Sequence, residues 1–317
     1  MIASGPARQP LHLAIVGPTA AGKSELALAV ARRAGDCEIV SLDAMQVYRE
    51  MDVGTAKPSA AERTEIVHHL IDAIDPGTEW SVALAQREAR AAVHDIEARG
   101  RRAVLVGGSG LYVQAVVDDL TLPVQDLALR AELEASTSEP GGLAAAWAEL
   151  RAADPDAAAR IDEHNQRRIV RALEVVRSTG RPFSEFGSGV FEARAALDAE
   201  FVGVWRSRTE LTARISQRID TMRAGGLEAE VARLDGRLSR SAVQAIGYKE
   251  LVQARRGELT VDVAFDLAER RTRSFARRQR MWFRRDPRVR WIRPDGGNVS
   301  AAADAVLACW RPECVLR

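Results

Sequence analysis

The sequence predicts an α/β fold, a parallel sheet flanked by helices, with an inserted all-helical domain. An apolar run over residues 11–16 ends in a glycine-rich loop, and a helical pattern follows it. Further apolar runs alternate with helical patterns along the chain, as in a parallel, doubly wound sheet. From about residue 124 to 196 the pattern is helical, and no run there is typical of a core strand.

The glycine-rich loop is the most informative local motif. Residues 17–24 have the sequence GPTAAGKS, which matches the phosphate loop G-x-x-x-x-G-K-[ST] at every fixed position. Between a strand and a helix, the N–H groups of such a loop converge on one point and bind anionic oxygens. The core is therefore predicted to be P-loop NTPase-like and to bind a diphosphate or polyphosphate. The expected ligand contacts come from Gly17, Pro18, Thr19, Ala20, Ala21, Gly22, Lys23 and Ser24, and the Ser24 hydroxyl is the expected Mg²⁺ ligand.

A second strand is predicted over residues 38–42, and Asp43 follows it directly. Ligands in parallel α/β sheets bind beyond the carboxyl ends of strands, so Asp43 is a candidate catalytic residue; the alternative is a helix-capping aspartate. A third strand is predicted over 66–72. Its adjacent histidines would point to opposite faces, which favours structural roles over metal binding. Asp43 and Asp72 are the candidates for a second metal ligand.

The remaining elements follow in order. A helix is expected from Ser81 to about Arg99, and residues 101–112 repeat the order strand, glycine turn, helix. Strand structure is predicted again over 201–205, and an edge strand over 288–293 precedes a terminal helix. The domains are predicted as a leader over 1–10, a core over 11–123 and 197–317, and the helical insertion over 124–196.

Basic residues are distributed unevenly. The chain contains only three lysines, Lys23, Lys57 and Lys249, so the latter two are candidates for a chemical role beside the phosphate-loop lysine. Residues 270–285 contain eight arginines, no acidic residue and three aromatic residues. Arginines on one helical face with aromatic residues behind them suit a nucleic-acid phosphate backbone. This stripe consists of Arg273, Arg277, Arg280 and Arg284.

Two further helices carry arginines. Arg167, Arg168 and Arg171 lie at one end of a predicted helix, and a solvated helix face would explain them equally well. Arg214 and Arg218 share a helix face with Glu210, which is typical of surface ion pairs.

Composition places the chain among ordinary globular proteins. It has 317 residues, of which 46% are hydrophobic and 28% charged, with a net charge of +1. No apolar run is long enough to predict a transmembrane helix, and residues 1–10 lack the apolar segment of a secretion signal. The three cysteines have neither metal-ligand nor disulfide spacing, so we expect a cytoplasmic protein. A monomer is the default expectation.

Several motifs occur in an order that resembles one known family. GPTAAGKS, LDAMQVYREMDVGTAKP, LVGGSGLY, QRRIVRALEV, QAIGYKE and RRQRMWFRR follow one another over about residues 11–292. Together they resemble the tRNA dimethylallyltransferases, also called tRNA isopentenyltransferases. Two positions differ from the commonest pattern: Ala44 replaces a frequent serine, and Ser109 replaces a frequent threonine while keeping a hydroxyl.

The resemblance implies a reaction. A dimethylallyl group would pass from dimethylallyl diphosphate to the exocyclic N6 amine of the adenosine on the 3′ side of the tRNA anticodon, and diphosphate would leave. The phosphate loop with Mg²⁺ would hold the diphosphate, with Lys23 and an arginine stabilising its charge. That arginine is Arg214 or Arg218, and the resemblance favours Arg214. Asp43 would be the general base.

The resemblance also implies contacts with the tRNA anticodon stem-loop, because the adenosine must be extracted from a stacked loop. Ser109 would lie near the flipped base, and the basic stripe would contact backbone phosphates. The expected tRNA contacts are Asp43, Ala44, Met45, Gln46, Ser109, Gln166, Arg167, Arg168, Ile169, Val170, Gln244, Lys249, Arg273, Arg277 and Arg280.

Two other functions fit part of the sequence. A small-molecule kinase that uses ATP would share the loop, the sheet and an inserted helical lid, but the arginine-aromatic stripe would have no use in it. A nucleotide-gated RNA-binding protein would explain the arginines, but it would leave Asp43 without a task.

Overall fold

The computed structural model describes residues 11–123, 125–186, 195–294 and 298–310. The chain folds into two compact units, Met1–Asp119 with Ala195–Arg317, and Leu120–Arg194. The leader predicted over residues 1–10 lies outside the described residues. The division into a catalytic core and a tRNA-contacting insertion stays a prediction, because a tRNA contact is a matter of function.

The first unit is built on a six-stranded sheet with the order β3-β2-β4-β1-β5-β6, in which every pair of neighbours is parallel. This confirms the predicted α/β fold class. The strands are β1 (His12–Val16), β2 (Cys37–Ser41), β3 (His68–His69), β4 (Arg102–Gly107), β5 (Ala199–Val204) and β6 (Arg290–Ile292).

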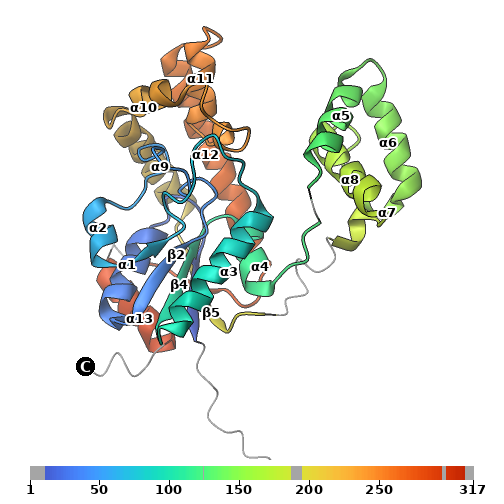
Figure 1. Ribbon diagram of the computed structural model, residues 1–317. Coiled ribbons are helices and arrows are strands. Elements are labelled where there is room, and N and C mark those ends of the chain that lie inside the picture. Colours follow the sequence, from blue (N-terminus) through green and yellow to red (C-terminus); the bar gives the residue numbers. More distant parts are fainter. Residues whose placement is uncertain (1–10, 124, 187–194, 295–297, 311–317) are drawn as a thin grey trace, which may run out of the picture. The chain divides into compact units, whose positions relative to one another are not determined.

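Helices cover both faces of the sheet (Figure 1). Alternate side chains of β1 point to opposite faces, so Leu13 and Ile15 join one apolar cluster, and Ala14 and Val16 join the other. The first cluster contains side chains of α1 (Lys23–Ala34) and α13 (Val299–Trp310). The second contains side chains of α3 (Val82–Ala98) and α4 (Gly110–Asp118).

A third apolar cluster in this unit contains Tyr48 and Met51, which follow β2, and several helices. Figure 1 shows α10, α11 and α12 stacked at one end of the unit. Through Val47, Tyr48, Met51 and Val53, this cluster holds the start of the segment that follows β2 against the helices. Its helices are α9 (Arg208–Ala224), α10 (Leu227–Leu234), η2 (Ala242–Gln244), α11 (Tyr248–Arg255) and α12 (Val261–Phe283), while α2 (Ala60–Glu65) follows the held segment.

The described residues of the second unit form helices and connecting turns and contain no strand, as predicted for the insertion. Its core includes Leu133, Leu150, Ile169 and Leu173, and the buried Glu174 carboxylate is paired with arginines of its own unit. The elements are α5 (Leu127–Ser138), α6 (Gly142–Ala153), α7 (Pro155–Ala158), α8 (Gln166–Thr179) and η1 (Phe183–Phe186).

The third strand is shorter than predicted. Only His68 and His69 are strand, because Leu70 and Asp72 have positive φ angles of 62° and 54°, which extended backbone excludes. Each histidine has a structural partner: His68 Nδ1 lies 2.7 Å from the Ile66 carbonyl, and His69 Nε2 lies 2.7 Å from Glu38 Oε2. Within the described residues, no helix has the length and apolar character needed to cross a membrane.

Candidate active site

The phosphate loop lies between the end of β1 and the start of α1. Gly17 has a φ of +135°, and a Cβ there would lie 3.0 Å from the Val204 carbonyl oxygen on β5, so this position requires glycine. At the other end, the first N–H groups of α1 have no partner inside the helix and are available to an anion. Lys23 Nζ donates to the Pro18 carbonyl at 2.8 Å, which bends this side chain back over the loop.

Three arginines that follow β5 surround the loop. Arg214 Nε donates to the Ala20 carbonyl at 2.7 Å, and Arg218 donates to Thr19 Oγ1 at 3.3 Å. The buried Arg206 donates to the Ala21 carbonyl at 3.3 Å. The interpretation of Arg214 and Arg218 as surface ion-pair partners is therefore wrong. Glu210 instead closes a capping box with Ser207 at the start of α9.

Burial has a strong effect on these cations. It lowers the pKa of Lys23 to about 8; the Asp43 carboxylate partly offsets this and Arg218 adds to it. Burial also lowers the pKa of Arg218, again against the influence of Asp43. The loop is thus a crowded site of positive charge that an anionic ligand would stabilise.

Asp43 lies just beyond β2, where the strand pattern placed it. Its Oδ1 accepts hydrogen bonds from the backbone N–H groups of Met45, at 2.8 Å, and Gln46, at 3.3 Å. These bonds fix the carboxylate in a turn. In the described part of the chain Oδ2 makes no hydrogen bond, and the side chain is exposed, so this oxygen is available to a substrate.

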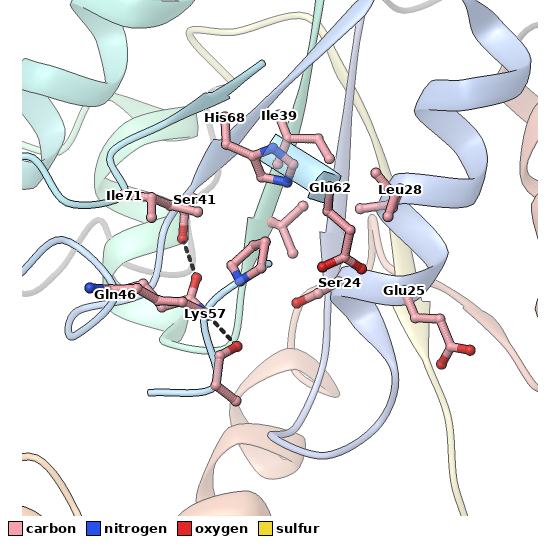
Figure 2. Close-up of a pocket in the computed structure, with 14 residues that line it drawn as sticks. Ser24, Glu25, Leu28, Ile39, Ser41, Gln46, Lys57, Glu62, His68 and Ile71 are labelled. Atoms are coloured by element: carbon pink, nitrogen blue, oxygen red, sulfur yellow. Dashed lines mark hydrogen bonds between the residues drawn. The ribbon is translucent and has the colours of Figure 1, made fainter. Parts of the chain in front are cut away.

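A cavity of about 250 Å³ lies beside the loop (Figure 2). Its polar lining includes Ser24, Ser41, Gln46 and Lys57, and its apolar lining includes Ile39. Ser41 Oγ donates to Gln46 Oε1 at 2.9 Å. Gln46 Nε2 in turn donates to the carbonyls of residues 55 and 56, at 3.2 and 3.3 Å. Gln46 therefore connects the end of β2 with the segment that lines the cavity at residues 56–58.

Lys57 and Asp72 form a structural group in the same wall. Lys57 Nζ pairs with Asp52 at 2.8 Å and with Asp72, and it donates to the Tyr48 carbonyl at 2.5 Å. Asp72 also pairs with Arg63 at 2.5 Å. These ion pairs occupy both side chains. We therefore assign Lys57 and Asp72 to holding the segment between β2 and β3 in place, and not to chemistry or metal binding. Among the described residues, no three His, Cys, Asp or Glu side chains form a metal-binding group.

Ser109 lies at the start of α4, beyond the end of β4. It is the N-cap residue of α4, but its hydroxyl makes no capping hydrogen bond. The helix α12 packs against this turn so closely that a Cβ on Gly110 would lie 2.0 Å from Cδ1 of Trp282. The hydroxyl of Ser109 therefore has no capping role in this turn.

The basic stripe lies along α12. Arg273, Arg277 and Arg280 line a cavity of about 370 Å³ together with Arg208 of α9. Arg273 is paired with Glu269, and the guanidinium of Arg280 lies 5.3 Å from the centre of the Trp205 ring. None of the described residues that line this cavity is acidic, and we name it the arginine cavity.

The other predicted tRNA contacts lie in different surroundings. Gln244 is exposed in η2, and Lys249 is half-buried in the first turn of α11. In the helical unit Arg167 and Arg168 are exposed, but the side chains of Ile169 and Val170 pack in the core. Gln166 Nε2 donates to Thr137 Oγ1 at 2.8 Å. Ala44 and Met45 are partly buried in the turn after Asp43.

Three residues at the site were not predicted from the sequence. Arg206 could have been noticed because it follows a strand end directly. Gln279 lies within RRQR, where it was treated only as part of a basic segment, yet its Oε1 accepts the Thr19 N–H at 2.8 Å. Glu230 carried no signal, because a glutamate on a helix is usually exposed; here it accepts three backbone N–H groups of residues 52–54.

Comparisons with known proteins identify the family of this chain. A family model described as IPP transferase matches residues 46–286. The tRNA dimethylallyltransferase of Salinispora arenicola is 49% identical over 300 residues, covering 93% of this chain and 85% of that protein. That of Bifidobacterium longum is 42% identical over 300 residues, covering 93% of this chain and 90% of that protein.

Solved structures are also similar. The tRNA isopentenylpyrophosphate transferase of Bacillus halodurans matches with a TM-score of 0.69 and 36% identity, covering 97% of this chain and 99% of that one. A eukaryotic dimethylallyltransferase acting on tRNA matches with a TM-score of 0.77, covering 94% of this chain and 77% of that one. At 24% identity, the latter supports the fold alone.

Proposed function

We propose how this chain, which belongs to the IPP transferase family, carries out the reaction of the tRNA dimethylallyltransferases. In that reaction dimethylallyl diphosphate alkylates the exocyclic N6 amine of the adenosine on the 3′ side of the anticodon. The observation that carries the assignment of roles is the position of Asp43, which lies close enough to Lys23 and Arg218 to influence the pKa of both.

The phosphate loop binds the diphosphate. As the allylic C–O bond breaks, its electron pair leaves with the diphosphate and negative charge grows on the leaving oxygen. Lys23, the loop N–H groups and Arg214 stabilise that charge, and Arg218 adds a second guanidinium. Their positions support this proposal because all of them converge on one loop.

Asp43 is the general base. The N6 lone pair forms the new bond to the allylic carbon, and the proton that the amine then loses passes to Oδ2 of Asp43. Hydrogen bonds to Oδ1 fix the orientation of the carboxylate. The Ser109 hydroxyl lies near the flipped adenine and helps to position it.

Mg²⁺ fits the residues that are present. Magnesium usually takes one or two protein oxygens, with phosphate oxygens and water completing its coordination. The exposed Ser24 hydroxyl at the start of α1 suits such a site, whereas Asp72 does not, because it is already paired. When bound, the ion would neutralise part of the charge of the diphosphate.

The tRNA contacts divide into two groups. Residues 43–46, Gln244, Lys249 and the arginine cavity of the first unit receive the extracted adenosine and nearby phosphates. In the helical unit Arg167 and Arg168 contact the anticodon stem-loop, while Gln166, Ile169 and Val170 hold their helix in place. We further propose that residues 124–196 act as a tRNA-contacting domain, and residues 11–123 and 197–317 as the catalytic core. We also propose that the protein is monomeric and cytoplasmic.

A transfer assay tests the function. Purified protein, Mg²⁺, unmodified tRNA and alkyl-labelled dimethylallyl diphosphate should yield labelled tRNA, and terminally labelled ATP should stay intact in parallel reactions. Transfer of phosphate from ATP to a small molecule, without labelled tRNA, would instead favour the kinase. Binding of tRNA without any labelling would favour the RNA-binding protein.

A further inference from the structure

The side chain of Gln279 belongs to α12, yet its acceptor serves the phosphate loop. Gln279 is only 5% exposed, and its Oε1 accepts the backbone N–H of Thr19 at 2.8 Å. The two residues are 260 positions apart in the chain. A buried amide oxygen without a partner costs free energy, so the hydrogen bond to Thr19 both satisfies Gln279 and ties its side chain to the phosphate loop.

The loop segment that Gln279 holds is an unfavourable one. Ala20, the next residue, has a φ of +62°, in the left-handed region that alanine seldom adopts. Arg214 holds the Ala20 carbonyl, and Arg218 holds the Thr19 hydroxyl. Gln279 supplies the bond that fixes the Thr19 N–H, so side chains of two helices fix this turn.

The absence of a side chain at Gly108 leaves the space that the Gln279 amide occupies. A Cβ on Gly108 would lie 2.5 Å from Gln279 Nε2, so a larger residue there would displace the amide. Two residues further along, Gly110 accepts the Trp282 ring in the same way. The β4–α4 turn therefore holds α12 in one position, and α12 in turn holds the phosphate loop.

We propose that Gln279 is a positioning residue that keeps the phosphate loop in its diphosphate-binding conformation. It touches the loop rather than the reacting atoms. Because α12 also carries Arg277 and Arg280 of the arginine cavity, one helix supports both the diphosphate site and a candidate phosphate-backbone site. The proposal rests on the diphosphate-binding role of the loop in the proposed function.

The first test is hydrogen exchange of the free protein, with no substrate present. Gln279→Met keeps the length of the side chain and removes the acceptor. Amides of Gly17 and residues 19–22 should then exchange at least about fivefold faster, the factor that corresponds to one hydrogen bond, while β1 amides keep their rates. Unchanged exchange in the loop, or equal acceleration in β1, would overturn the proposal.

The second test measures binding and turnover. Gln279→Met should weaken Mg²⁺-diphosphate binding about fivefold and raise KM for the allylic diphosphate similarly, with kcat and the tRNA Kd within about twofold. Met281→Ala, at an exposed position on the same helix, is the matched control. A loss in kcat alone would overturn the positioning role. Failure of the unmodified protein to bind diphosphate would refute the proposed function instead, and the exchange experiment would still test the contact.

Discussion

We expect Glu230 to be the main anchor of residues 51–58, the segment that lines the cavity beside the phosphate loop at residues 56–58. It is 2% exposed, and its carboxylate accepts the N–H groups of Asp52 and Val53 at 2.9 Å and of Gly54 at 3.1 Å. The Tyr248 hydroxyl donates to the same carboxylate at 2.5 Å. We predict that Glu230→Gln destabilises the protein and loosens residues 51–58.

The magnitude follows from these four donors. The amide oxygen of the glutamine can keep the two bonds to Oε2, but each loses its charge assistance, at a cost of about 1 kcal/mol. The amide nitrogen would face the Gly54 N–H, donor against donor, and would leave that group unsatisfied, at a cost of about 1–3 kcal/mol. The sum is about 3–5 kcal/mol, since the Tyr248 hydroxyl can rotate to accept.

Urea denaturation followed by circular dichroism measures this loss, and limited proteolysis reports on local opening of residues 51–58. Glu228→Gln is the control, because Glu228 lies on the same helix and is exposed. A change below about 1 kcal/mol in Glu230→Gln, together with unchanged proteolysis, would refute the account of Glu230 as an anchor.

Four further outcomes are expected. Asp43→Asn should lower kcat about 10²–10⁴-fold with the tRNA Kd unchanged, and single-turnover transfer measures it. Lys23 has its pKa lowered to about 8, so it loses its charge as pH rises through that value; diphosphate affinity measured by calorimetry should fall there, and a flat profile would contradict this. Gly110→Ala should lower the unfolding free energy by about 1–3 kcal/mol, because its Cβ meets Trp282. Arg277→Ala should reduce the salt slope of tRNA binding by about 0.7–0.9 if it contacts one phosphate.

Local patterns predicted most of the fold correctly. The patterns of apolar residues located β1, β2, β4, β5 and the long helices, because each buries a continuous face, and they also located the more exposed edge strand β6. The third strand was predicted too long, since the positive φ angles of Leu70 and Asp72 are set by tertiary contacts: Asp72 is held by Lys57 and Arg63. A propensity for extended structure contains no information about such ion pairs.

The site was predictable where one short segment carries its chemistry. The GPTAAGKS loop and Asp43 each follow a strand closely in the sequence, so both could be placed at the carboxyl end of the sheet without knowledge of distant contacts. The partners of the loop could not be placed in this way. The spacing of Arg214 is typical of a surface ion pair, but in the structure it contacts the Ala20 carbonyl. Gln279 lies 260 positions from its partner Thr19. Contacts of this range depend on how helices pack, which one sequence does not specify locally.

The end of β4 distinguishes this phosphate loop from that of the P-loop nucleotide hydrolases. β4 pairs with β1, and in P-loop nucleotide hydrolases an aspartate of the Walker B motif helps to hold Mg²⁺. Here β4 ends at Gly107 and continues into Gly108 and Ser109, with no carboxylate. Asp43 instead follows β2, which lies one strand further from β1 in the sheet than β4 does. Oδ2 of Asp43 makes no hydrogen bond among the described residues, so this carboxylate has an oxygen available for the proton of an incoming amine, which is the role that we propose for it.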